Sequence, residues 1–402
     1  MPLTQRSKKE VQERRKANST FSELWSTIPD LARGESERLE RRTRAKGITP
    51  RGERVFNVGS TLVILFFAVA WSWSIALARV TGRAAHASPA AGILTSALTE
   101  KDAPSMAYLT DAALTVVDPL RGESGKLRAR IQQPGEALSG GKLPSGVVAT
   151  YSSGAAAEST AALTAPRKTG VWSLAIAVGN AIRPITDFSV ITLFPASQKK
   201  SAKIGLYYIG NWPSARASRA SARADYTPPG GFIEVTQATQ NTALSDHFKL
   251  KDFFPHDQQA VWPKYIVVKM KLVDKLELVL NDLRAHGIRT DRVIVMSGFR
   301  TPQYNVRGGD TRGRAALSRH MYGDAADIFI DNDGNGNMDD LNRDGRVNIG
   351  DARVILEAAN RVEAAHPSLI GGVGVYAGTS AHGPFAHIDT RGYPARWIGT
   401  GD

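Results

Sequence analysis

A long uncharged segment near the N-terminus restricts what this chain can fold into more than any other feature. Residues 55–78, VFNVGSTLVILFFAVAWSWSIALA, contain no Asp, Glu, Lys or Arg. About 20 predominantly apolar residues are enough for a helix to cross the hydrocarbon core of a bilayer. We therefore predict a single transmembrane helix over 55–78.

The residues before this segment are basic and predict how the helix is oriented. Residues 1–54 hold 14 Lys and Arg against 8 Asp and Glu, so they account for +6 of the net charge of +13. Basic flanks stay in the cytoplasm. We predict a basic cytoplasmic arm over 1–54 and a single-pass protein of a bacterial inner membrane, with its C-terminal domain in the periplasm.

Two alternatives concern the same N-terminal region. The AHA at 85–87 fits the cleavage site of a signal peptide, but the basic region and the apolar run are both longer than signal peptides have. The basic charge also suits nucleic acid, yet it is concentrated beside the predicted helix. We expect this charge to orient the helix and predict no nucleic-acid partner.

The middle of the chain changes in composition. The chain as a whole contains no Cys, so a transition-metal site must use His and carboxylates. Residues 79–170 are rich in Ala, Ser, Thr and Gly, which predicts a mostly flexible spacer. In 171–240, FSVITLFP and IGLYYIGNWP predict strands of a small β-rich module, followed by an exposed basic loop at 215–224.

The C-terminal part, 245–402, mixes helices and strands without regular alternation. Apolar residues at steps of four and three in 262–287 predict an amphipathic helix against a sheet, and VIVMSGF at 293–299 predicts a buried strand. This pattern indicates an α+β fold. A helix at 352–365 and strands at 373–376 and 385–389 complete the predicted domain.

Two stretches of this domain, SRHMYGDAAD at 318–327 and FAHID at 385–389, suggest a metal site. Side chains alternate between the faces of a strand, so Asp327 is expected on an accessible face, opposite the core. His387 can approach Asp327 if the two strands are neighbours, and His320 can close a third corner. Two imidazoles and one carboxylate suit zinc with an open fourth position. Taken singly, each residue is also compatible with a structural His or a turn-capping Asp.

These motifs add a resemblance to the argument. SGFRTPQYN, SRHMYGDAAD and FAHID resemble the zinc D-alanyl-D-alanine carboxypeptidase family, whose fold is shared with the Hedgehog signalling domain, and HFKLKDFF at 247–254 resembles the segment that opens such domains. The resemblance implies that His320, Asp327 and His387 bind zinc. It also implies that Arg300 stabilises the negative charge on the attacked carbonyl oxygen or holds a substrate carboxylate.

The resemblance implies hydrolysis of an amide in peptidoglycan stem or cross-link peptides, with water activated by zinc. The chain departs from the family at the general base, because Pro384 stands where many members have an acidic residue. His382 is the first candidate for this base, since some relatives use a His just upstream of the last ligand, and Asp389 is the second. A non-catalytic, membrane-tethered cell-wall binding or scaffold module is the alternative.

The oxygen-rich stretch 331–351, DNDGNGNMDDLNRDGRVNIGD, resembles an EF-hand or dockerin calcium loop. Two overlapping counts fit, so we predict one or two structural Ca²⁺ ions, and an acidic solvated loop is the alternative. The first count uses Asp331, Asp333, Asn335, Asn337 and Asp339; the second uses Asp340, Asn342, Asp344, Arg346, Asn348 and Asp351.

Overall fold

The computed structural model describes Thr61 and residues 106–138, 143–213, 226–308, 311 and 314–399. The chain divides into two compact units, Met1–Pro89 and Ala90–Asp402. Apart from Thr61, which is helical, the predicted basic arm, transmembrane helix, AHA site and basic loop 215–224 lie outside the described residues. In the part that is described, no helix is both long and apolar enough to cross a membrane.

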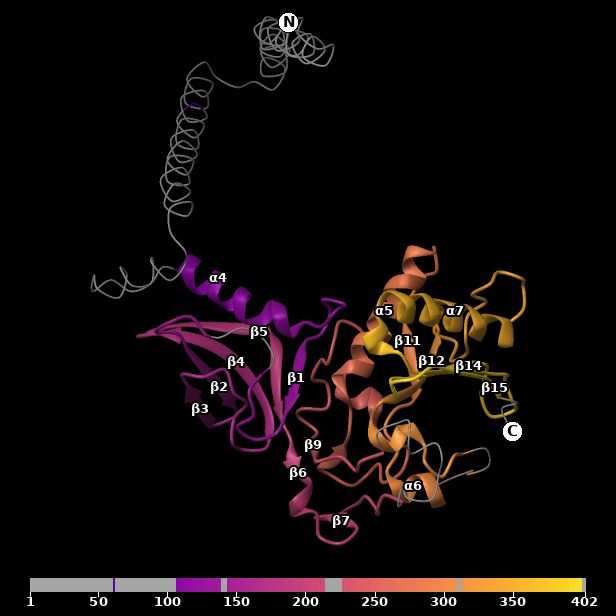
Figure 1. Cartoon of the computed structure of the whole chain (residues 1–402), viewed down its shortest axis with the longest axis horizontal. Coiled ribbons are helices and arrows are strands. Elements are labelled where there is room, and N and C mark those ends of the chain that lie inside the picture. Colours follow the sequence, from indigo (N-terminus) through magenta and orange to yellow (C-terminus); the bar gives the residue numbers. More distant parts are fainter. Residues whose placement is uncertain are drawn as a thin grey trace, which may run out of the picture. The chain divides into compact units, whose positions relative to one another are not determined.

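The second unit begins with a five-stranded sheet in the order β1-β5-β4-β2-β3. Helix α4 (Met106–Val117) packs against β4 and β5 of this sheet (Figure 1). The sheet is antiparallel except for the β1–β5 pair. Its strands are β1 (Ala129–Gln132), β2 (Val148–Ser153), β3 (Ala156–Thr160), β4 (Gly170–Val178) and β5 (Ala181–Thr192).

This sheet corrects the prediction of a mostly flexible spacer over 79–170. From Met106 onward, the described residues of that range contribute α4 and three strands. Together with β4 and β5 they form a hydrophobic core, in which Tyr151 and Trp172 are fully buried beside Ala149. The composition was misleading because small side chains bury little area each but allow elements to pack closely.

Short strands lead from this sheet to the C-terminal domain. The three-stranded sheet has the order β10-β9-β6, and a two-stranded hairpin pairs β7 with β8. Strands are present in both FSVITLFP and IGLYYIGNWP, as predicted, but FSVITLFP lies mainly in β5 of the first sheet, so residues 171–240 do not form a separate β-rich module. The bounds are β6 (Phe194–Pro195), β7 (Lys203–Ile204), β8 (Tyr207–Tyr208), β9 (Gly231–Val235) and β10 (Lys264–Ile266).

The C-terminal domain is built on a second five-stranded sheet, in the order β11-β12-β14-β13-β15. Helices α5 (Met270–Ala285) and α7 (Ile349–Ala365) contact each other beside this sheet (Figure 1), and α7 packs on β13 and β14. The strands are β11 (Val293–Ser297), β12 (Ala325–Ile330), β13 (Gly372–Tyr376), β14 (Phe385–Asp389) and β15 (Ala395–Gly399).

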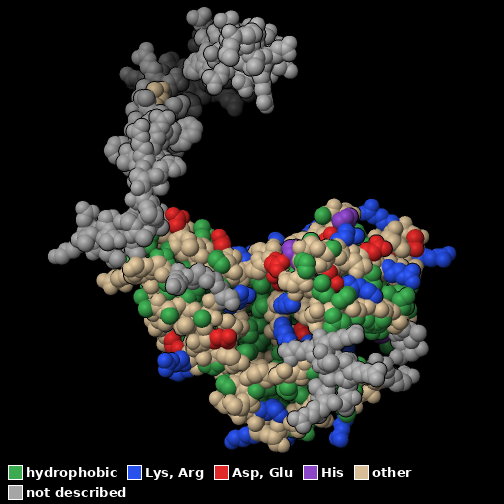
Figure 2. Space-filling model, in the orientation of Figure 1, with side chains coloured by type: hydrophobic (Ala, Val, Ile, Leu, Met, Phe, Trp, Pro, Cys, Tyr) green, Lys and Arg blue, Asp and Glu red, His purple; other side chains and the backbone are tan. Residues whose placement is uncertain are grey.

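The predicted α+β class and the helices and strands of this domain are confirmed. The periodic apolar residues of α5, among them Leu272, Leu276 and Leu283, are fully buried. The same core includes Leu127, which precedes β1, and Ala129 and Ile191 from the first sheet, so it extends beyond the predicted domain start at 245. On the face drawn in Figure 2, acidic and basic side chains of the described residues are interspersed.

Candidate metal centre

One row of residues crosses the whole second sheet. The register pairs Ser297 with Asp327, Asp327 with His387, His387 with Gly374, and Gly374 with Trp397. Residues directly opposite each other on neighbouring strands point to the same face of a sheet. Each of the five strands therefore contributes one residue to a single row on one face of the sheet.

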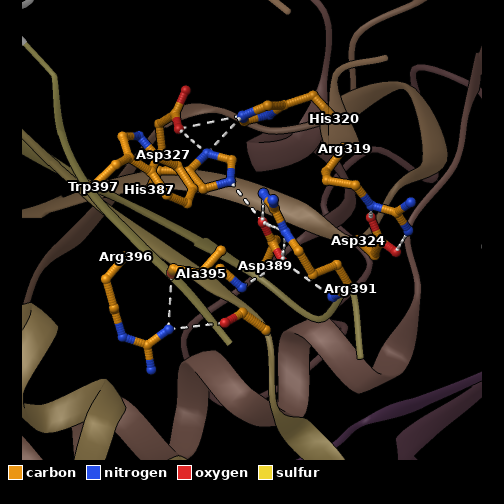
Figure 3. A network of polar contacts seen from close by, with 12 residues as sticks. Arg319, His320, Asp324, Asp327, His387, Asp389, Arg391, Ala395, Arg396 and Trp397 are labelled. Carbon is orange, nitrogen blue, oxygen red and sulfur yellow. Dashed lines mark hydrogen bonds and ion pairs between the residues drawn. The ribbon is translucent and has the colours of Figure 1, made fainter. Parts of the chain in front are cut away.

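The row brings together the three predicted zinc ligands, here called the His–Asp–His triad (Figure 3). His320 reaches it from the 3-10 helix η6 (Arg319–Tyr322), which directly precedes β12. Asp327 Oδ1 lies 2.8 Å from His387 Nδ1 and 3.2 Å from His320 Nε2, and the two imidazole nitrogens are 3.2 Å apart. These separations are close to the roughly 3.3 Å between two ligands of a tetrahedral zinc ion with bonds near 2.05 Å.

The opposite nitrogen of each imidazole is held by a hydrogen-bond acceptor. His320 Nδ1–H donates to the carbonyl oxygen of Gly298 at 2.7 Å, and His387 Nε2–H donates to Asp389 Oδ2 at 3.1 Å. Such contacts fix the tautomer and the orientation of metal-binding histidines. The lone pairs of His320 Nε2 and His387 Nδ1 therefore face Asp327, as a metal requires.

Electrostatics within the triad also suit a cation. Burial lowers the pKa of His320, and the charge of Arg300 lowers it further. Burial opposes ionisation of Asp327, but its contacts with His320 and His387 outweigh burial and hold its pKa well below the usual range. Burial also opposes protonation of His387, whose pKa is raised by its hydrogen bonds to Asp327 and Asp389. A metal cation would be attracted by the ionised carboxylate of Asp327 and would bind both imidazoles in their neutral form.

The surroundings of Asp327 differ from the prediction in one respect. Strand β12 is buried along its whole length, and Asp327 is not on an accessible face. Its outer oxygen, Oδ2, accepts a hydrogen bond from Arg300 Nη2 at 2.8 Å. Alternation along the strand separates the two faces correctly, but it cannot show that neighbouring segments cover both of them.

Arg300 follows β11 and lies beside the triad. Its Nε donates to Ser297 Oγ at 2.9 Å, while Nη2 pairs with Asp327. The guanidinium is largely but not fully buried. Its predicted place next to the metal ligands therefore agrees with the structure, and Ser297, to which no role was assigned from the sequence, is the residue that orients it.

Asp389 does not have the geometry of a general base, which corrects its place as second candidate. It contacts His387 Nε2, on the side of the imidazole away from the triad. Its oxygens also accept hydrogen bonds from Gly372 N and from the backbone and guanidinium of Arg391. Burial opposes its ionisation, but His387 and Arg391 hold its pKa far below the usual range. Asp389 is placed to orient His387.

His382, the first candidate for the base, lies in the segment between β13 and β14. Its ring meets the ring of Phe385 edge-on, with centroids 5.1 Å apart, and Phe385 stands two residues before His387 on the same face of β14. Its Nδ1 contacts the carbonyl oxygen of Gly383 at 2.8 Å. Nε2 is therefore the nitrogen that can accept a proton.

Trp397 completes the row and was not predicted from the sequence. Its ring centroid lies 5.2 Å from that of His387, and its Nε1 donates to Tyr376 Oη at 2.8 Å. The indole occupies space above Gly374, where an added Cβ would meet it at 2.2 Å. Only a glycine at 374 lets Trp397 pack against the imidazole of His387. Because β15 joins the sheet beside β13, this contact could be found only from the strand order.

The predicted calcium stretch begins where β12 ends, and its two halves differ. In the first half, Asp331, Asp333 and Asp339 form a group whose ligand atoms lie within 4.8 Å of one another. Asn335 and Asn337 stand between these acids, and both side chains are exposed.

The second half is occupied by hydrogen bonds to its own backbone. Asp351, the predicted twelfth ligand, caps helix α7 and accepts hydrogen bonds from Leu341 N, Asn342 N and Asn348 N. It therefore acts as a capping residue. Side-chain oxygens of four other candidates accept hydrogen bonds from backbone N–H groups within the turn. Asp340 accepts from Asp344 N and Gly345 N, Asn342 from Asp344 N, Asp344 from Arg346 N, and Asn348 from Gly350 N.

Comparison with known proteins gives one match. Residues 247–373 match the sequence model of the family described as Peptidase M15, which is the family that the motifs resemble. The matched segment includes Arg300, His320 and Asp327 and ends before His387, which the sheet register brings to the site. No curated protein and no solved structure matches the chain significantly.

Proposed function

We propose that this protein hydrolyses amide bonds in the stem or cross-link peptides of peptidoglycan, because residues 247–373 match the Peptidase M15 family, whose members depend on zinc. The observation that carries the proposal is the meeting of His320 Nε2, Asp327 Oδ1 and His387 Nδ1. Their donor types and their hydrogen-bonded opposite atoms are those of a catalytic zinc site.

The residues of the triad would hold zinc, which when bound supplies Lewis acidity that polarises a carbonyl group and lowers the pKa of water. Arg300 uses Nε and Nη2 for Ser297 and Asp327. Its Nη1 has no hydrogen-bond partner within the described part of the chain. This nitrogen can donate to the oxygen of the attacked carbonyl or to a substrate carboxylate.

His382 is the residue to which we assign the proton transfers. Its Nε2 accepts a proton from the attacking water and returns it to the leaving amine. The contact with Phe385 and the bond from Nδ1 to Gly383 restrict the orientation of the ring. Trp397 restricts His387 from the other side.

The proposal includes the place of the protein in the cell. The predicted helix over 55–78 would anchor it once in a bacterial inner membrane, with residues 1–54 in the cytoplasm and the peptidase domain in the periplasm, beside its substrate. Alkaline phosphatase fused after residue 105 should be active, whereas the same enzyme fused after residue 50 should be inactive. The proposed cofactors also include calcium, in the oxygen-rich stretch after β12.

The test of the function is a digest of purified peptidoglycan by the full-length protein in detergent, with zinc added. We expect soluble products from the wild type, none from His320→Ala, and unchanged products from His286→Ala, in which a half-exposed histidine on α5's C-terminal end is removed. Released D-alanine would identify a carboxypeptidase, and fewer cross-linked dimers would identify an endopeptidase. Binding of peptidoglycan without any cleavage would instead favour the scaffold function.

A further inference from the structure

The first half of the oxygen-rich stretch, residues 331–339, is a closed loop at one end of β12. Asp331 directly follows Ile330, the last residue of the strand, and Asp339 N returns to donate to the carbonyl oxygen of Ile330 at 2.8 Å. Met338 is buried in the main core and anchors the returning chain. We refer to residues 331–339 as the calcium loop.

The calcium loop contains a buried charge that no described residue compensates fully. The side chain of Asp331 has no exposed surface, and its Oδ1 is buried without a hydrogen-bond partner in the part of the chain that is described. Its other oxygen accepts a hydrogen bond from Gly336 N at 3.2 Å and lies 3.4 Å from Arg292 Nη2. An unpaired buried carboxylate oxygen is costly, so Oδ1 is the atom of this loop that a cation would stabilise most.

Two more carboxylates meet at the same place. Ligand atoms of Asp331, Asp333 and Asp339 lie within 4.8 Å of one another, which brings like charges together. Arg292 contacts only the outer oxygen of Asp331, and its side chain is half exposed. One guanidinium at that distance leaves most of this negative charge unbalanced.

The backbone turns the intervening residues toward these carboxylates. Asn335 N donates to Asp333 Oδ1 at 3.1 Å, and Asn337 N donates to Asn335 Oδ1 at 2.8 Å. Gly336 sits between them with φ +83°, a conformation that L side chains rarely adopt. Residues 331, 333, 335, 337 and 339 thus follow the ligand positions of a calcium loop, with a backbone carbonyl offered at 337.

We propose that the calcium loop binds one Ca²⁺ through Asp331 Oδ1, Asp333, Asn335, the carbonyl oxygen of Asn337, and Asp339. Calcium takes 6–8 oxygen ligands in flexible geometry, so this set together with water suffices. Magnesium needs a tighter, near-ideal octahedron and keeps its waters, which suits such a loop less well. We confine the proposal to residues 331–339, because no carboxylate oxygen of the following residues, 340–351, is buried without a hydrogen-bond partner.

Because of the position of the loop, a bound ion would also affect neighbouring parts of the domain. Asp331 is four residues after Asp327 on the same chain segment, so ordering the loop fixes the end of β12. Asn337 also lies against Gly383, where an added Cβ would be 3.2 Å from Asn337 Oδ1, and Gly383 is next to His382. If the proposed function holds, calcium orders the end of β12 beyond Asp327, which the sheet itself holds, and supports the segment of the general base.

Equilibrium dialysis of the full-length protein in detergent against radioactive calcium tests this proposal. The protein is first stripped of metals, and the titration is run without zinc and without peptidoglycan. We expect one Ca²⁺ per chain in the wild type, loss of binding in Asp333→Asn, and one Ca²⁺ per chain in the matched control Asp344→Asn. Asp333 is exposed, so its substitution should leave the fold intact; circular dichroism checks this.

Three results would overturn the proposal: no saturable binding by the wild type, unchanged binding by folded Asp333→Asn, or two ions per chain. Calcium should also raise the Tm of the wild type and not that of Asp333→Asn. Because neither measurement involves zinc or substrate, a digest without products would leave the calcium result intact, and absent calcium binding would leave the peptidase proposal intact.

Discussion

The His–Asp–His triad and the calcium loop begin on the same strand, yet they are built in different ways. In the triad, each imidazole has its opposite nitrogen held by Gly298 or Asp389, and Arg300 holds the outer oxygen of Asp327. In the calcium loop, the buried oxygen Asp331 Oδ1 has no such contact among the described residues. The triad is therefore held by the protein itself, whereas in the calcium loop the proposed ion would compensate an oxygen that the protein leaves unpaired.

This difference follows from where the donors stand. Asp327 and His387 are directly paired across two central strands of a sheet, so the ladder hydrogen bonds fix their separation. The acids of the loop are joined only by a turn of chain with exposed side chains at 333, 335 and 337. Metal sites on strands need little reorganisation when they bind, while loop sites couple binding to local ordering.

The largest effect on turnover is expected from a substitution of Arg300, beside the triad. Removing its guanidinium in Arg300→Ala should lower kcat about 10²–10³-fold, the usual cost of losing one donor to a developing oxyanion. Zinc should remain bound, because Arg300 contacts Asp327 Oδ2 and the triad uses Oδ1. Steady-state kinetics and metal analysis measure both, with the exposed Arg289→Ala as control. If zinc is lost together with activity, Arg300 acts by holding Asp327 and has no direct role toward substrate.

A smaller effect is expected at Asp389. Asp389→Asn keeps the shape but removes the charged acceptor of His387 Nε2–H, and such changes typically weaken metal affinity about 10–100-fold. Competition with a fluorescent zinc chelator measures the affinity, with the exposed Asp291→Asn as control. Unchanged zinc affinity with lost turnover would contradict the orienting role and return Asp389 to consideration as the base.

Calcium should raise the stability of the protein clearly but should change its affinity for zinc only slightly. At free calcium about tenfold above its Kd, the ion adds about 1.4 kcal/mol, which corresponds to a rise in Tm of roughly 3–6 °C for a domain of this size. The zinc affinity of the triad should change less than threefold, because its donors are held by the sheet. Differential scanning fluorimetry and the same zinc competition check this; a large loss of zinc affinity on calcium removal would show that the two sites are not built independently.

The smallest effect is expected at Asp351, which distinguishes the two halves of the oxygen-rich stretch. Loss of the cap in Asp351→Ala should cost about 0.5–2 kcal/mol of stability. The same loss should appear with and without calcium, because the carboxylate bonds to backbone N–H groups. Thermal unfolding in both conditions measures it. A loss seen only in the presence of calcium would make Asp351 a calcium ligand.

The triad could be predicted because the family resemblance supplied what local patterns could not. Alternation along two short strands placed Asp327 and His387 on one face each, but whether the strands are neighbours was left open, and the sheet register now shows that they are. The role of Asp389 could not be predicted in this way, because Asp389 and His387 lie on the same strand face. Only the structure shows that His320 and Asp327 contact Nδ1 of His387 while Asp389 contacts Nε2, which makes Asp389 an orienting residue. Trp397 and Gly374 were missed because their contact depends on the position of β15 in the sheet.

The first sheet was missed for a different physical reason. Strand β4 alternates clearly, with Trp172, Leu174 and Ile176 buried, but its partner β2 buries Ala149 beside Tyr151. Alanine, serine and threonine carry little hydrophobic signal even when they are completely buried. Composition therefore suggested a linker in a region where close packing of small side chains forms a sheet.

Zinc binding by the His–Asp–His triad can be tested by zinc K-edge X-ray absorption of the full-length protein, with metal content measured on the same sample. The triad predicts one zinc per chain, bound by two imidazoles and oxygen ligands, and loss of zinc or of one imidazole in His387→Ala. Zinc without imidazole ligands, or an identical spectrum from wild type and His387→Ala, would contradict it.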